Sequence, residues 1–147
     1  MTNRREKITE ALTETMKIDP DEYSPITSPN RLKSLGYALA GWLYMLRRQK
    51  NTRLQAVASI AVFLLALWLQ IDALRWAILI LTVTMVWMAE FINAAVEAAI
   101  NLASTEVHPM AKVGKDVASA AVLLGVVASI LIGLLILGPS LLNKLGV

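Results

Sequence analysis

The sequence lacks cysteine, contains one histidine and has few charged side chains, and each shortage excludes a class of site or protein. Without cysteine the chain has neither disulfides nor thiolate metal sites, and His108 alone cannot form a histidine cluster, so a metal ion would need oxygen ligands. Charged residues are only 17% of the 147 residues, whereas 56% are hydrophobic, which exceeds the usual share in a soluble domain. The composition therefore predicts an all-α integral membrane protein, and no nucleic acid is expected as a partner.

The apolar residues are gathered in three long stretches, at about 54–71, 76–100 and 117–142. At about 1.5 Å per residue, each would form a helix long enough, with its flanks, to cross a hydrocarbon core of roughly 30 Å. Asp72 and Arg75 mark a short turn between the first two spans, and residues 102–116 are predicted to form a polar loop before the third. We expect Gly138 and Pro139 to end or kink the third helix.

The part of the chain before the first span has two different compositions. Residues 1–30 are polar and contain three prolines, so they are predicted to be a partly disordered cytoplasmic extension, leaving 31–147 as the membrane domain. Within about 32–49, apolar residues recur at helical spacing, and basic residues close the segment: Arg47, Arg48 and Lys50. This pattern predicts an amphipathic helix lying on the membrane surface.

The basic residues indicate how the spans are oriented. The basic segment before the first span and the 102–116 loop, with Lys112 and Lys115, fall on one side of the membrane, whereas the other side has only Arg75 and Lys144. The positive-inside rule then places the N-terminus and this loop in the cytoplasm, with the protein in the inner, cytoplasmic membrane.

Polar residues form a stripe at the end of the second span, in the stretch EFINAAVEAAIN. At 100° per residue the four fall within an arc of about 80° on one helix: Glu90, Asn93, Glu97 and Asn101. Small alanines flank the arc and allow neighbouring helices to approach closely, so the stripe is predicted to point into a helix bundle near the cytoplasmic boundary.

The residue types in this stripe suit phosphoryl transfer. Carboxylate and amide oxygens are ligands that Mg²⁺ accepts, and Mg²⁺ commonly binds phosphates as its remaining partners. The adjacent Lys115 and Asp116 add a cation suited to phosphate and a further carboxylate. The same groups could instead join helices or line an ion path, and Lys115 and Asp116 could simply begin a helix, so composition alone leaves these alternatives open.

Two motifs, in the order expected between spans, resemble the small prokaryotic diacylglycerol kinases, a family of membrane lipid kinases that includes undecaprenol kinases. One is EFINAAVE, from Glu90 to Glu97, which is similar to the family pattern E-x-x-N-[ST]-A-x-E; the other is HPMAKVGKDVASAAVLL, from His108 to Leu124. The resemblance covers about residues 31–138.

The resemblance implies roles for the residues of the stripe. Glu90 matches the general base that would take the proton from the lipid hydroxyl as it attacks the γ-phosphate of ATP. Asn93 matches an asparagine that makes a polar contact in the active site, and Glu97 matches a carboxylate ligand of the metal ion that bridges the nucleotide phosphates.

Further positions are matched to the nucleotide and the metal. Lys115 and Asp116 match a pair that organises the nucleotide, and Tyr37 matches a possible adenine contact. Two positions depart from the family: Gln49 stands where many members have a second metal-binding glutamate, and Asn101 stands where some have an aspartate near the nucleotide. A glutamine oxygen still coordinates Mg²⁺, but more weakly, so Gln49 stays a predicted metal ligand and Asn101 a predicted nucleotide contact.

The resemblance also implies the reaction and the assembly. The expected activity is ATP-dependent phosphorylation of a membrane lipid hydroxyl, with diacylglycerol giving phosphatidic acid as the main expectation. Undecaprenol as acceptor and a non-enzymatic relative are the alternatives. Members of the family are homotrimers with sites shared between subunits, and the cost of burying the polar stripe in one thin bundle agrees with this.

Overall fold

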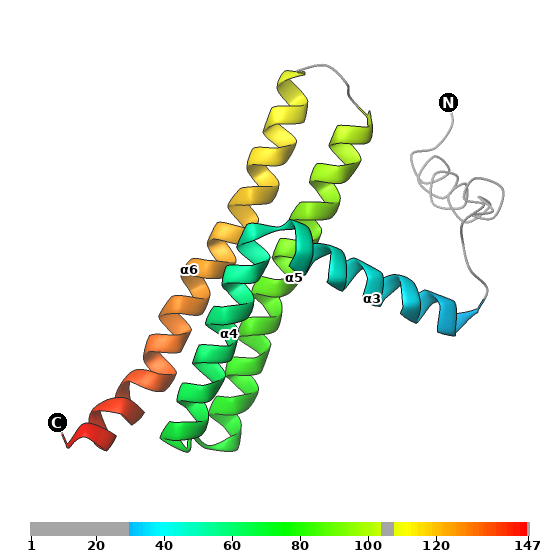
Figure 1. Cartoon of the computed structure of the whole chain (residues 1–147). Helices are drawn as coiled ribbons and strands as arrows, with labels where there is room; N and C mark the ends of the chain where they lie inside the picture. Colours follow the sequence, from blue (N-terminus) through cyan, green and yellow to red (C-terminus); the bar gives the residue numbers. More distant parts are fainter. Residues whose placement is uncertain (1–29, 104–107, 147) are drawn as a thin grey trace, which may run out of the picture. The chain divides into compact units, whose positions relative to one another are not determined.

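The computed structural model describes residues 30–103 and 108–146, and every regular element within these residues is an α-helix. There are four such helices (Figure 1): α3 (Arg31–Arg48), α4 (Lys50–Leu69), α5 (Ala73–Ala103) and α6 (Pro109–Leu145). This confirms the predicted all-α fold. The expectations for the extension before Asn30 lie outside the described residues.

The chain divides into one unit that ends at Gly41 and a second that begins at Trp42. The described residues of the first unit form the initial turns of α3, which confirms a helix here, while its location on the membrane surface stays a prediction. The second unit contains the rest of α3 and all of α4, α5 and α6.

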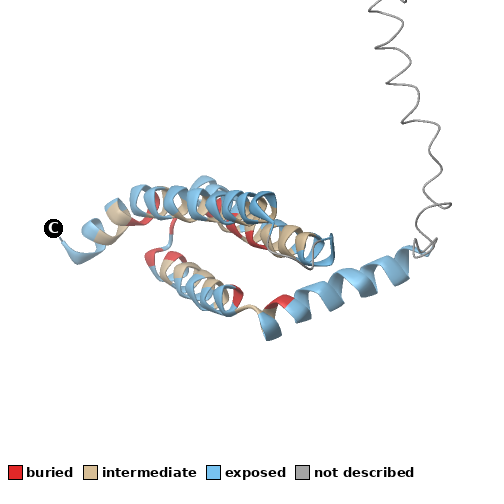
Figure 2. Ribbon diagram, turned by 90° about the horizontal axis from the view of Figure 1, so that it is seen from above, coloured by how far each residue is buried: buried red, intermediate tan, exposed pale blue. Residues whose placement is uncertain are grey.

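Helices α4, α5 and α6 are the three that are long and apolar enough to cross a membrane, which confirms the predicted spans. Buried residues of the second unit lie where these helices face one another (Figure 2). Much of the remaining apolar surface is exposed in the isolated chain, as expected for helices whose outer faces meet lipid or neighbouring helices.

The predicted polar loop at 102–116 is wrong over most of its length, because α6 begins at Pro109. His108 occupies the N-cap position and its Nδ1 accepts a hydrogen bond from the Met110 N–H at 3.2 Å. Pro109 lacks an N–H, which is no loss in the first turn of a helix, where that group has no partner. Lys115 and the residues around it are therefore held on a helix, not on a loop.

The far end of α6 follows the second of the two alternatives expected at Gly138 and Pro139, a kink and not an end. Pro139 does not end the helix, which continues to Leu145 and is capped by Gly146 in the left-handed conformation at φ 77°. Figures 1 and 2 show the last turns bending away from the line of the earlier ones, as the ring of a proline inside a helix favours.

Opposite the 103–108 connection, the three spans are joined by polar contacts. Asp72 accepts a hydrogen bond from the Arg75 N–H at 3.0 Å, which caps α5 and, with the Arg75 charge, lowers the pKa of the Asp72 carboxyl. The Arg75 side chain also donates to Ser140 Oγ of α6 at 2.9 Å. Lys144 Nζ donates to the Trp68 carbonyl at 2.7 Å, so α6 is tied to α4 as well.

An apolar cluster lies at this same end and completes the junction. Its buried members come from all three spans and the α4–α5 turn: Ala66, Leu69, Ile71, Leu79, Ile136 and Leu137. The helices are therefore held together at the end away from the 103–108 connection, and the polar stripe of α5 lies toward the other end.

Candidate functional site

The polar stripe predicted from the sequence lies on α5, and its first member is deeply buried. Glu90 is only 4% exposed, although it belongs to a helix whose surface is largely accessible in the isolated chain. Burying a carboxylate is costly, so a carboxylate in such a position marks a functional site more often than a packing position.

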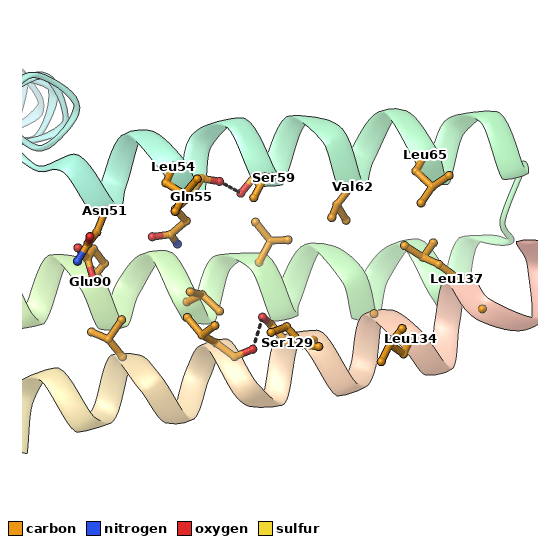
Figure 3. A pocket seen from close by; sticks show the side chains of 18 of the residues that line it. Asn51, Leu54, Gln55, Ser59, Val62, Leu65, Glu90, Ser129, Leu134 and Leu137 are labelled. Carbon is orange, nitrogen blue, oxygen red and sulfur yellow. Dashed lines mark hydrogen bonds between the residues drawn. The ribbon is translucent and has the colours of Figure 1, made fainter.

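Glu90 lies at one end of a groove of about 640 Å³ that is bordered by α4, α5 and α6. Figure 3 shows Asn51 of α4 beside Glu90 at this end, with Gln55 close by. The groove then continues between apolar side chains toward Leu65 and Leu137. The shape is therefore that of a long apolar channel with a polar, carboxylate-bearing end.

Asn93 and Glu97 follow Glu90 on the same helix and are joined by a hydrogen bond. Asn93 Nδ2 donates to Glu97 Oε1 at 3.3 Å, whereas the buried Asn93 Oδ1 has no hydrogen-bond partner. The hydrogen bond orients the Glu97 carboxylate. It leaves Asn93 Oδ1 able to bind another group. Both oxygens are hard donors of the kind that Mg²⁺ binds, so the chemistry of this pair fits the predicted metal.

The pair alone does not enclose a metal ion. Among residues 30–103 and 108–146, no group of three or more histidine, aspartate or glutamate side chains lies close enough to hold one. Mg²⁺ commonly uses one or two protein carboxylates with phosphates and water, so Glu97 and Asn93 suit a metal that arrives with a nucleotide.

The start of α6 brings Lys115 to the last turn of α5. Lys115 Nζ donates to Asn101 Oδ1 at 2.7 Å, which joins two residues that the sequence assigned separately to the nucleotide. Gly114 packs against Ile100 here: a Cβ at Gly114 would lie 2.8 Å from Ile100 Cδ1, so the end of the Ile100 side chain would have to move. Asp116 pairs instead with Lys112, so the adjacent Lys115 and Asp116 have different partners.

The two remaining predicted residues lie on or after α3. Gln49 is half-buried at the N-cap position of α4 and makes no side-chain capping bond there, so its role as a metal ligand stays a prediction. Tyr37 is 60% exposed and belongs to the unit that ends at Gly41, so its contact with adenine also stays a prediction.

An aromatic cluster lies beside Glu90. Trp42 stacks on Trp87 with ring centroids 4.8 Å apart, and it also meets Phe91 at 4.9 Å. Trp87 Nε1 donates to Ser59 Oγ of α4 at 3.1 Å. These contacts hold Trp42 of α3 and the middle of α4 against α5 beside the buried carboxylate.

The sequence analysis missed the part of the site that α4 contributes. Asn51, Gln55 and Ser59 are spaced four residues apart, so they share one face of α4, and all three line the groove. The signal that could have identified this face of α4 is the recurrence of a polar residue in each of its first turns.

Residues 36–137, more than two thirds of the chain, match the family described as "Prokaryotic diacylglycerol kinase". The chain belongs to this family. It is 37% identical over 117 residues to a diacylglycerol kinase of Synechocystis sp., covering 79% of this chain and 67% of the relative.

Other members of the family are also similar to this chain. An undecaprenol kinase of Bacillus subtilis is 33% identical over 109 residues, which cover 74% of this chain and 89% of that protein. A diacylglycerol kinase of Escherichia coli is 30% identical over 100 residues, covering 68% and 82% respectively. Membership confirms the resemblance stated above and the predicted enzyme class, a membrane lipid kinase.

Proposed function

We propose that this lipid kinase transfers the γ-phosphate of MgATP to the free hydroxyl of diacylglycerol, giving phosphatidic acid and ADP. The observation that carries the proposal is the position of Glu90, a buried carboxylate at the polar end of an apolar groove. A lipid acceptor needs this combination, because its hydrocarbon chain must lie in an apolar environment while its hydroxyl meets a base.

Glu90 is the proposed general base. The lipid hydroxyl lies within hydrogen-bond reach of the carboxylate, which takes the proton as the hydroxyl oxygen attacks the γ-phosphorus and the bond to the β-phosphate oxygen breaks. The groove holds an acyl chain alongside α4 and α6, so the hydroxyl reaches the same place in each turnover. Its apolar walls also keep water away from the reacting phosphate.

Glu97, the Asn93 amide oxygen and Gln49 are the proposed protein ligands of Mg²⁺. When bound, the ion neutralises phosphate charge and orients the γ-phosphate. Lys115, held by Asn101, is placed to bind phosphate oxygens, because its contact with a neutral amide leaves its positive charge uncompensated there. Asp116 and Tyr37 complete the proposed nucleotide site.

The proposed setting is the cytoplasmic face of the inner membrane. The basic residues before α4 and at the start of α6 support this orientation by the positive-inside rule, and ATP is available on that side. We propose a homotrimer in which residues 31–147 form the membrane kinase domain and the first 30 residues a cytoplasmic extension.

Undecaprenol is the second candidate acceptor, and the similar Bacillus subtilis undecaprenol kinase is the observation that favours it. The two acceptors share a hydroxyl on a long hydrocarbon, so the groove admits either in principle. A non-enzymatic relative is a weaker reading, because Glu90 and Glu97 are both present and the carboxylates are replaced only at Gln49 and Asn101.

Phosphate transfer by the purified full chain in mixed micelles decides among these acceptors. With labelled MgATP, we expect diacylglycerol to be phosphorylated with a higher kcat/KM than undecaprenol. A preference for undecaprenol would replace the proposed acceptor. No transfer to either lipid by a correctly assembled protein would contradict the proposed reaction.

A further inference from the structure

The polar face of α4 contains a buried side-chain donor that has no hydrogen-bond partner. Ser59 is fully engaged: its hydroxyl donates to the Gln55 carbonyl at 2.8 Å and accepts from Trp87 Nε1 at 3.1 Å. Gln55 Nε2 is buried and has no hydrogen-bond partner, although Gln55 lines the groove. An amide nitrogen is a donor only, so what it lacks is an acceptor.

A buried donor without a partner is rare in folded proteins because its lost hydration is not replaced. Gln55 lines the groove that the proposed function assigns to the lipid, so an atom of that ligand can supply the missing acceptor. The hydrocarbon of a lipid cannot supply an acceptor. An oxygen close to the reacting hydroxyl can.

The position of Gln55 along the groove selects which oxygen this is. Asn51 and Glu90 lie together at the polar end, and Gln55 is one turn deeper on α4, a rise of about 6 Å. An acylglycerol whose free hydroxyl reaches Glu90 has an ester on the neighbouring glycerol carbon, so its carbonyl oxygen lies only a few bonds from that hydroxyl, on the side of the acyl chain. A polyprenol has no oxygen beyond its hydroxyl.

We propose that Gln55 is a specificity-determining residue, whose side-chain amide donates a hydrogen bond to an ester carbonyl of the acceptor and thereby favours acylglycerols over polyprenols. The proposal rests on the proposed function, because it places the acceptor hydroxyl at Glu90. The occupant is one lipid class, a glycerol ester with a free hydroxyl.

The test compares two acceptors that differ only in the carbonyl: a diacylglycerol and the dialkylglycerol ether with chains of the same length. Both are assayed with MgATP in mixed micelles, using the wild-type full chain and Gln55→Met, whose thioether cannot donate a hydrogen bond. We expect the wild type to use the ester with about tenfold higher kcat/KM than the ether, the size of one hydrogen bond to a ligand. Gln55→Met should lose this factor on the ester and keep its rate on the ether.

Ser129→Ala is the matched control, because it removes a polar group from the same groove on α6. Its ester-to-ether ratio should equal that of the wild type. If Gln55→Met is inactive on both acceptors, Gln55→Asn, which withdraws the donor by one methylene, should still show a reduced ratio.

The outcomes distinguish a failure of the Gln55 proposal from a failure of the proposed kinase function. Equal use of ester and ether by the wild type, or an unchanged ester-to-ether ratio in an active Gln55→Met whose oligomer is intact, would overturn the role of Gln55 and leave the kinase reaction intact. Transfer to undecaprenol but to neither glycerol lipid would overturn the proposed acceptor, and the assignment of Gln55 with it. A ratio unchanged in Gln55→Met, with its oligomer dissociated, would assign the groove to a second copy of the chain.

Discussion

At the scale of single residues, Lys112 and Lys115 lie close together at the start of α6 but differ in their partners. Lys112 forms an ion pair with Asp116, so its charge is matched. Lys115 donates to the neutral amide of Asn101, which fixes the ammonium group without matching its charge. A fixed cation of this kind is suited to polyphosphate, whereas an already paired cation is less so.

Removing the two charges should therefore have different effects. We expect Lys115→Met to raise KM for MgATP by about tenfold or more, as the loss of a charge-assisted hydrogen bond predicts, with little change in KM for the lipid. Lys112→Met is the matched control. It should raise KM for MgATP by less than about threefold, because an exposed ion pair contributes little binding energy. Steady-state kinetics with each substrate varied in turn measures both. Equal effects of the two substitutions would argue against a phosphate role for Lys115.

At the scale of helices, hydropathy predicted three spans because long apolar runs leave no other stable structure in a bilayer. The helix ends were less predictable. The sequence interpretation began the third helix after Asp116, at the first charge-free run, whereas the N-cap of His108 and the ring of Pro109 begin it earlier. Charged residues can form the first turns of a membrane helix when those turns lie outside the hydrocarbon core. The change from charged to apolar residues after Asp116 therefore did not mark the start of the helix.

The groove itself could not be predicted from the sequence. Periodicity identified the face of α5 that carries Glu90, but the space beside it depends on how α4 and α6 are placed. The contribution of α4 was missed because Asn51 and Gln55 are uncharged and lie within an apolar span. Their significance becomes clear only when they lie opposite a buried carboxylate.

A substitution on α6 tests whether an acyl chain occupies this groove. Gly133 lines the groove, and a Cβ built there meets no atom within 4 Å, so we expect a leucine side chain at this position to extend into the channel and fill part of it. Gly133→Leu should raise KM several-fold for long-chain diacylglycerol and less for short-chain diacylglycerol, which does not reach that depth. Kinetics across a series of chain lengths measures this.

Gly36→Leu provides the control for that series, since Gly36 is also a helical glycine with no atom within 4 Å of its Cβ position. Both substitutions remove a helix-destabilising glycine, but only Gly133 borders the groove. A uniform change in KM at every chain length, or the same change in both variants, would mean that the acyl chain lies elsewhere.

At the scale of the whole molecule, the second unit is joined by different contacts at its two ends. The apolar cluster and the contacts of Arg75 and Lys144 join α4, α5 and α6 at the end away from the site. Toward the site end, the Lys115–Asn101 contact joins α5 to α6, and the Trp87–Ser59 hydrogen bond joins α5 to α4. We propose that the lipid enters the groove beside α4 and that a second subunit adds to the metal site that Glu97 and Asn93 begin.

The proposed trimer rests on the family resemblance, and the composition of the site in one chain agrees with it. One chain supplies oxygen donors on α5 and a cation on α6, but within its described residues it does not gather three acidic or histidine side chains around one point. A neighbouring copy of the site end would supply further oxygen ligands without burying unpaired charge in lipid.

The account depends most on Glu90, and Glu90→Gln tests it most directly. The substitution keeps the shape of the side chain and its place beside Asn51 but removes the base. The decisive measurement is the rate of phosphate transfer from MgATP to diacylglycerol by the purified variant, alongside its oligomeric mass and its binding of MgATP. The account predicts a loss in kcat of at least about a hundredfold, with the assembly and the nucleotide binding retained. A variant that assembles normally and transfers phosphate at the wild-type rate would contradict it.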